Sequence, residues 1–246
     1  MYEDLDRPPL RVPALVRALE PEGWRVEVLA ETASTNAVVG ERARAGEPAG
    51  LVVVAEQQSA GRGRLDRAWV SPPRAGLTFS VLLRPEAVVG WLPLLTGLAV
   101  ARALRARAGV DAVLKWPNDV LIGDLKVAGI LAEVPEPGAV VLGIGLNVTT
   151  RQDELPVETA TSLKLAGAST TDRDTLLRAV LRELRQVLAE EPYEDYRKLC
   201  GTLGRQVRIE LPSGDPVVGR AETVDRDGRL VLDGTAYGAG DVVHLR

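Results

Sequence analysis

The chain is poor in the residues that carry metal and nucleophilic chemistry. Its 246 residues include one histidine, His244, and one cysteine, Cys200. A zinc site of His and Cys ligands cannot be assembled from these two residues, and a disulfide within the chain is excluded. A Ser–His–Asp triad would depend on His244 alone. We interpret both residues as packing groups of the C-terminal region. Catalysis should then rest on Arg, Lys, Asn, Asp, Ser and Gln, which suit phosphate chemistry.

Long apolar runs and an excess of positive charge are also missing. Runs such as Leu51–Ala55 are too short to cross a bilayer. The N-terminal residues, MYEDLDRPPL, lack the features of a signal peptide. We therefore expect a cytoplasmic protein with no membrane partner. Thirty basic residues face 34 acidic ones, and the net charge of −4 disfavours a general nucleic-acid binder.

The apolar periodicity predicts a core of helices and strands, followed by a small β-rich unit. A short helix is expected after Pro13, and longer helices over 34–45, 92–108 and 172–190. Strands are expected over 51–56, 77–83, 113–116, 120–122, 125–134 and 140–148. After Leu203, short β-rich runs alternate with Gly, Asp and Pro turns, as in small β-barrels. We place a domain boundary near Gly201, which separates residues 1–201 from residues 202–246.

Four segments place cationic or amide side chains among glycines or apolar residues. Residues 61–69 (GRGRLDRAW) interleave three arginines with glycines, without the ending of a Walker A loop. The others are KWPND at 115–119, KVAGILAE at 126–133 and GIGLN at 143–147.

Each of these segments also has a plainer structural explanation. A lysine in a central strand is unfavourable without a nearby anion. Lys126 therefore meets a ligand, points to water from an edge strand, or pairs with Asp124 or Glu133. Asn147 either meets a ligand or caps its strand. Trp69 and Trp116, taken alone, are typical of core residues.

Together the segments resemble, in order and spacing, the catalytic domain of biotin–protein ligases. Residues 31–36 (ETASTN) resemble the family's biotin motif, residues 56–69 its arginine-rich loop, and GDVVHLR the end of its C-terminal domain. Leu65 and Asp66 depart from the pattern, because well-known members often have Arg and Gly there. The resemblance implies an α+β fold, with a mixed or antiparallel sheet and helices on one side, plus an SH3-like C-terminal β-barrel. It also implies the actinobacterial-like form without an N-terminal DNA-binding domain.

The resemblance further implies an ATP- and Mg²⁺-dependent ligase. Such an enzyme converts biotin to biotinyl-5′-AMP and transfers biotin to a lysine of the biotin carboxyl carrier protein of acyl-CoA carboxylases, such as acetyl-CoA carboxylase. The implied catalytic residues are Lys126, Arg64, Arg62 and Lys115. The implied biotin-binding residues are Ser34, Thr35, Asn36, Gln58, Gly61, Arg62, Arg64, Lys126 and Gly129. The implied ATP-binding residues are Arg62, Arg64, Arg67, Trp69, Lys115, Asn118, Lys126 and Asn147. Magnesium would arrive with ATP near Asn147 rather than at a fixed protein site, and at most a weak homodimer is expected.

Two alternatives stay open. A lipoate–protein ligase is similar in fold, but its Gly-rich loop typically carries few arginines, and KWPND with KVAGIL fits biotin better. A biotin-responsive DNA-binding repressor needs an N-terminal helix-turn-helix domain, and the 33 residues before Ser34 are too few for one. Residues 203–246 hold six arginines, no lysines and seven acids, so they lack the basic stripe of a nucleic-acid-binding barrel.

Overall fold

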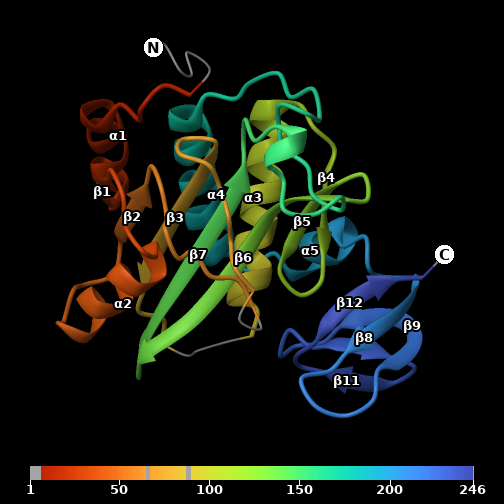
Figure 1. Ribbon diagram of the computed structural model, residues 1–246. Coiled ribbons are helices and arrows are strands. Elements are labelled where there is room, and N and C mark those ends of the chain that lie inside the picture. Colours follow the sequence, from red (N-terminus) through yellow and green to blue (C-terminus); the bar gives the residue numbers. More distant parts are fainter. Residues whose placement is uncertain (1–6, 65–66, 87–89, 246) are drawn as a thin grey trace.

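The larger part of the protein is built on a seven-stranded sheet. The computed structural model describes residues 7–64, 67–86 and 90–245, so Leu65 and Asp66 lie outside the described residues. The strand order is β1-β2-β3-β7-β6-β5-β4 (Figure 1). The strands are β1 (Arg25–Leu29), β2 (Leu51–Ala55), β3 (Gly76–Leu83), β4 (Ala112–Lys115), β5 (Asp119–Ile122), β6 (Leu125–Glu136) and β7 (Ala139–Asn147). Only the β1–β2 pair among these described strands is parallel, so the expected mixed sheet is confirmed.

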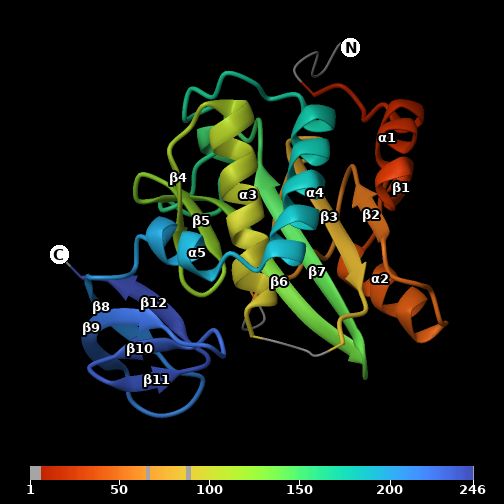
Figure 2. The same cartoon turned by 180° about the vertical axis from the view of Figure 1, so that it is seen from behind.

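The helices cover the two faces of this sheet unequally. One face carries the large core, covered by α1 (Val12–Leu19), α3 (Leu92–Ala108), α4 (Arg173–Glu190) and α5 (Tyr193–Leu199) (Figure 2). The expected layer of helices on one side is therefore present. On the opposite face, α2 (Thr35–Arg44) covers a smaller core, in which Val39 packs with Leu51 and Val53. Side chains alternate between faces along a strand, so β2 serves both cores. Among the described residues, no helix combines the length and apolarity needed to span a membrane.

The predicted long helices form where capping and periodicity place them. Helix α3 spans the predicted residues, and α4 begins after Asp172, whose side chain accepts a hydrogen bond from Thr175 N (3.0 Å). Three elements lie outside the prediction: β1, α5 and β11 (Thr235–Tyr237). Each is seven residues or shorter, and so carries little periodic signal. Two 3₁₀ turns complete the larger part, η1 (Glu20–Glu22) and η2 (Gln152–Glu154).

The C-terminal residues form a second, five-stranded antiparallel sheet in the order β11-β10-β9-β8-β12. Its other strands are β8 (Gln206–Glu210), β9 (Val217–Val224), β10 (Leu230–Leu232) and β12 (Asp241–His244). Two tryptophans join it to the larger part. Trp116 Nε1 donates to Gly228 O (3.0 Å), and Trp91 Nε1 donates to the carbonyls of Asp225 and Arg226. Buried indole N–H groups need such partners, so these bonds hold the small sheet beside the α3 and β4 end of the main sheet.

Candidate active site

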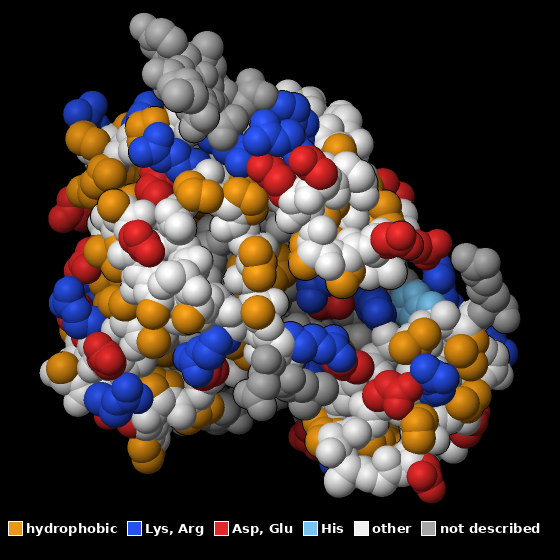
Figure 3. Space-filling model, viewed as in Figure 1, with side chains coloured by type: hydrophobic (Ala, Val, Ile, Leu, Met, Phe, Trp, Pro, Cys, Tyr) orange, Lys and Arg blue, Asp and Glu red, His pale blue; other side chains and the backbone are white. Residues whose placement is uncertain are grey.

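A cavity of about 870 Å³ opens where the main sheet meets the C-terminal sheet. Figure 3 shows Lys, Arg and His side chains gathered around this hollow. Its lining includes all but one of the residues named from the sequence: Ser34, Thr35, Asn36, Gln58, Arg62, Arg64, Arg67, Trp69, Lys115, Asn118, Lys126, Gly129 and Asn147. The exception is Gly61. A Cβ at Gly61 would lie 2.4 Å from Trp69 O, so glycine is required where this loop closes on itself.

The floor of the cavity is made of glycine backbone. Gly129 in β6 pairs with Gly145 in β7, so two positions without side chains lie side by side. The Trp69 indole lies over both, because a Cβ at Gly145 would approach Trp69 Cε2 to 2.3 Å and one at Gly129 would approach Cζ3 to 3.4 Å. The ammonium of Lys126 lies 5.9 Å from the centre of the Trp69 ring. Trp69 is therefore a site residue and not a core residue.

One end of the cavity is a polar network around the start of α2. Thr35 donates from N (2.8 Å) and Oγ1 (3.0 Å) to Gln58 Oε1. Ser80 Oγ, fully buried in β3, lies 2.7 Å from Thr35 Oγ1 and 2.6 Å from Asn36 Oδ1. Ser34 occupies the predicted N-cap position, but its side chain makes no capping hydrogen bond. The network can offer both donors and acceptors to a ligand. Sequence reasoning missed Ser80, although a serine inside the apolar run LTFSVLL is a usable signal.

A carboxylate links this network to the arginine loop, which we define as residues 61–69. Glu133 Oε2 accepts from Asn36 Nδ2 (2.6 Å) and from Arg62 Nη2 (3.1 Å). The strand backbone makes room for this contact, since a Cβ at Gly143 would lie 2.2 Å from Asn36 Oδ1. Arg62 is thereby held near the α2 end of the cavity.

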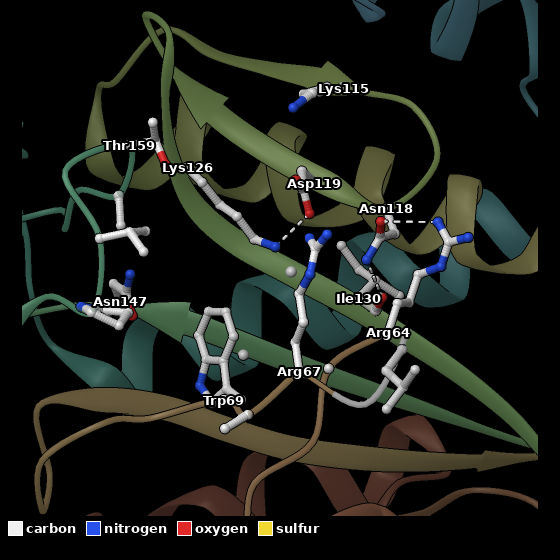
Figure 4. A pocket seen from close by; sticks show the side chains of 18 of the residues that line it. Arg64, Arg67, Trp69, Lys115, Asn118, Asp119, Lys126, Ile130, Asn147 and Thr159 are labelled. Atoms are coloured by element: carbon white, nitrogen blue, oxygen red, sulfur yellow. Dashed lines mark hydrogen bonds and ion pairs between the residues drawn. The ribbon is translucent and has the colours of Figure 1, made fainter. Parts of the chain in front are cut away.

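The middle of the cavity holds its cations (Figure 4). Lys126 Nζ lies 2.6 Å from Asp119 Oδ1, so its partner is neither Asp124 nor Glu133. Arg64 Nη1 donates to Asn118 Oδ1 (3.3 Å), while Asn118 Nδ2 donates to Ile130 O (2.9 Å). Burial lowers the pKa of Arg64 and also that of Lys115. Both shifts mean that these cations are partly removed from water, where an anionic ligand would stabilise them.

Asn147 closes the far side of the cavity. Its Nδ2 donates to Thr161 O (2.9 Å), which leaves the amide oxygen as its other polar atom. No group of three or more His, Cys, Asp or Glu side chains gathers to hold a metal within the described part of the chain. The oxygen donors of Asn147 and Asp119 are of the type that Mg²⁺ prefers, and Mg²⁺ commonly binds one or two such groups plus substrate phosphates. The residues present therefore fit magnesium carried in with ATP.

The C-terminal sheet also lines the cavity, through Arg205, Asp241, Val243, His244 and Leu245. Arg67 forms an ion pair with Asp241, which ties the arginine loop to β12. His244 packs against Thr202 and Arg205 as interpreted, and it also lines the same cavity as Lys126, which the sequence did not predict. The other residue so interpreted, Cys200, is buried, and burial raises the pKa of its thiol.

Comparison with known proteins agrees with this arrangement. The model of the biotin/lipoate A/B protein ligase family matches residues 28–149, and that of the biotin protein ligase C-terminal domain matches residues 202–245. The chain is 43% identical to the biotin–[acetyl-CoA-carboxylase] ligase of Mycobacterium tuberculosis, over 98% of this chain and 99% of that one.

Two solved structures from Aquifex aeolicus share the fold. A variant of its biotin protein ligase in complex with biotin superimposes with a TM-score of 0.78 at 29% identity, covering 91% of this chain and 100% of that one. The ligase in complex with biotin and ATP gives a TM-score of 0.73 at 28% identity, covering 90% and 99%. The chain belongs to the biotin/lipoate A/B protein ligase family, among its biotin–protein ligases.

Proposed function

We propose that this enzyme activates biotin with ATP to biotinyl-5′-AMP and then transfers the biotinyl group to a lysine of a carrier protein. The observation that carries this proposal is the position of Lys126. Its ammonium lies beside Trp69 and Asp119 in a cavity with a neutral polar network at one end and cations toward the other. Such a cation can serve two anionic reactants that meet between those ends.

The polar network suits the ureido ring of biotin. That ring offers N–H donors and a C=O acceptor, and Ser34, Thr35, Asn36 and Gln58 can satisfy both kinds of group. Backbone groups near Gly61 and Arg62 complete this end. Gly129 lets the ligand approach the backbone. Buried polar partners of this kind discriminate strongly against analogues that lack the ring's polar groups.

The remaining site residues suit ATP. We assign Arg64 and Arg67 to its phosphates, with Arg62 at the junction of biotin and phosphate, and Trp69 to packing along the ligand. We assign Lys115, Asn118 and Asn147 to ATP and its magnesium. When bound with ATP, the magnesium ion neutralises phosphate charge and so favours departure of pyrophosphate.

In the first step, a carboxylate oxygen of biotin forms a bond to the α-phosphorus of ATP. The bond from that phosphorus to the bridging oxygen breaks, and pyrophosphate leaves with the electron pair. The nucleophile is already ionised at neutral pH, so this step needs no general base. Lys126, Arg62, Arg64 and Lys115 offset the repulsion between the two anions and stabilise the charge that develops.

In the second step, the neutral amine of the acceptor lysine forms a bond to the acyl carbon. The bond from that carbon to the phosphate oxygen breaks, AMP leaves with the electron pair, and the amine releases a proton to solvent. We propose that the acceptor is the biotin carboxyl carrier protein domain of an acyl-CoA carboxylase, that the reaction takes place in the cytoplasm, and that the protein forms at most a weak homodimer. We further propose a catalytic domain of residues 1–201 and a small domain of residues 202–246. That boundary is supported by the gap between the end of α5 at Leu199 and the start of β8 at Gln206.

We propose biotin and not lipoate as the substrate for two reasons. The relative with 43% identity is named for biotin, and three arginines occupy the loop where lipoate ligases typically carry few.

The decisive experiment is exchange of labelled pyrophosphate into ATP without an acceptor protein. We expect exchange that requires biotin, because the first step is reversible and independent of the acceptor. Exchange supported by lipoate and not by biotin would overturn the choice of substrate. Absence of exchange with either acid, in protein shown to be folded, would overturn the proposed reaction.

A further inference from the structure

The cavity wall nearest the C-terminal sheet carries a cation without a close anion. Lys115 stands at the end of β4, half-buried, and no carboxylate of the described residues lies within ion-pair distance of its ammonium. Two neighbouring cations have carboxylate partners, since Lys126 pairs with Asp119 and Arg67 pairs with Asp241, while Arg64 is held by the amide oxygen of Asn118. A half-buried ammonium without a partner is unfavourable in the empty cavity and favourable once an anion arrives.

Two groups of the C-terminal region, His244 and Arg205, line the same cavity as Lys115. His244 Nε2 lies 3.1 Å from Thr202 Oγ1, and His244 Nδ1 lies 3.3 Å from Arg205 Nη1. Thr202 Oγ1 accepts from Trp116 N (3.1 Å), and Trp116 directly follows Lys115. These bonds fix the imidazole against the wall that carries the unpaired ammonium.

The same bonds determine the form of the imidazole. Arginine can only donate, so His244 Nδ1 must accept from Arg205, and the proton must sit on Nε2 facing Thr202. His244 is therefore neutral in the unliganded protein. Burial, together with the nearby charges of Lys115 and Arg205 and against the opposing effect of Asp124, lowers its pKa to about 4.

Arg205 itself is held only loosely. Its carboxylate neighbour, Asp124, lies 3.7 Å away with a side chain 87% exposed, so the pair is weak. Its other contact is with a neutral imidazole. The guanidinium can turn toward an anion in the cavity without breaking a strong bond, and it can present two parallel donors to phosphate oxygens.

We propose that Lys115, Arg205 and His244 form one anion subsite that receives the pyrophosphoryl end of ATP, so that the C-terminal sheet holds the leaving group of the first step. This inference rests on the proposed function for the identity of the anion. When Arg205 turns to the phosphate, His244 Nδ1 loses its donor and takes a proton from solvent. The positive charge then grows where the pyrophosphate oxygen receives its electron pair. Arg205 and His244 are the new residues here, since Lys115 is already assigned to ATP.

Because His244 is the only histidine, its imidazole signals in an NMR spectrum need no assignment. The test follows its titration in the intact protein, alone and with inorganic pyrophosphate. We expect the pKa of His244 to rise from about 4 past the ordinary value of 6.5 when pyrophosphate binds, so that the imidazole is protonated near neutral pH, and to be unaffected by biotin alone. A titration curve that saturating pyrophosphate leaves unchanged would overturn the subsite.

A matched pair of variants gives the kinetic test. Arg205 and Arg208 have similarly exposed side chains, 49% and 47%, but Arg208 pairs with Glu210 and does not line the cavity. We expect Arg205→Ala to raise KM for ATP about tenfold, as for the loss of a hydrogen bond to a charged group, and to leave KM for biotin unchanged. Arg205→Lys should recover part of the loss, and Arg208→Ala should match wild type.

The outcomes separate this inference from the proposed function. If the wild type performs biotin-dependent exchange and the Arg205→Ala variant has an unchanged KM for ATP, the subsite is overturned and the proposed function stands. A His244 signal that responds to pyrophosphate in a protein without exchange activity supports the subsite and overturns the reaction.

Discussion

The indole of Trp69 fills the space that a side chain at Gly145 would need, because a Cβ at that position would lie 2.3 Å from Trp69 Cε2. Two residues earlier on β7, the side chain of Asn36 fills the space beside Gly143 in the same way, because a Cβ added there would lie 2.2 Å from Asn36 Oδ1. Alternate positions of one strand thus support the two ends of the cavity. Trp69 belongs to the proposed nucleotide end and Asn36 to the proposed biotin end.

This relationship predicts that two small substitutions weaken the binding of different ligands. Gly145→Ala should displace Trp69 and weaken ATP binding by about tenfold or more, since overpacking costs roughly 1–3 kcal/mol. Gly143→Ala should displace Asn36 and weaken biotin binding to a similar degree. Binding titrations with each ligand separately provide the measurement. Gly97→Ala in α3 is the control, because its Cβ meets Leu114 at an ordinary 3.4 Å. Equal losses for both ligands in both variants would contradict the division of the cavity.

Lys126→Gln tests the central cation. The substitution keeps a polar, unbranched stem that is one atom shorter and removes the charge that faces both reactants. We expect pyrophosphate exchange to fall about a hundredfold, the effect typical of losing one transition-state donor. Lys198→Gln, on the exposed surface of α5, should retain full activity. Near-normal exchange by a folded Lys126→Gln protein would return this lysine to a purely structural pairing with Asp119.

Arg64 is expected to retain the intermediate. Its bond to Asn118 joins the arginine loop to the turn between β4 and β5. Arg64→Gly removes this bond and adds backbone freedom, which costs roughly 1 kcal/mol in ordering. The adenylate should still form, but it should escape and acylate lysines of unrelated proteins.

The measurement for Arg64 is biotin blotting of serum albumin incubated with enzyme, biotin and MgATP. Arg74→Gly is the matched control, since Arg74 adopts a positive φ of 59° that glycine tolerates and does not line the cavity. Normal adenylate formation with albumin labelling no higher than wild type would show that Arg64 has no retention role. Complete loss of adenylate would show that the first step depends on Arg64 and that the remaining cations cannot replace it.

Stability should decrease in acid through Glu154. A hydrogen bond from Arg7 (2.5 Å) is the main cause that lowers the pKa of Glu154 from 4.5 to about 2. The folded state therefore binds this proton less readily than the unfolded chain. The stabilisation is complete above about pH 4.5 and is lost as the pH falls toward 2.

Glu154→Gln should remove this dependence on pH. The variant should melt at a lower temperature than wild type at pH 7, and the difference in Tm should shrink between pH 5 and pH 3. Thermal unfolding followed by circular dichroism across this range is the measurement. Parallel curves of Tm against pH for the two proteins would contradict the assigned role.

Sequence alone determined the parts of this protein that depend on local pattern. The apolar period and the Asp172 cap predict α3 and α4, because helix formation is decided by residues a few positions apart. The four motifs also predict which side chains meet. Nearly every residue named from them lines one cavity.

The tertiary structure decided what depends on residues far apart in the chain. Asp119, and not Asp124 or Glu133, pairs with Lys126, because the β5–β6 register brings those two side chains together. Ser80 reaches Asn36 across the face of the sheet covered by α2. His244 enters the cavity only because the two tryptophans place the C-terminal sheet against the main one. The physical reason is that long-range contacts depend on strand register and on how the two sheets pack against each other, and neither leaves a periodic signal in a single sequence.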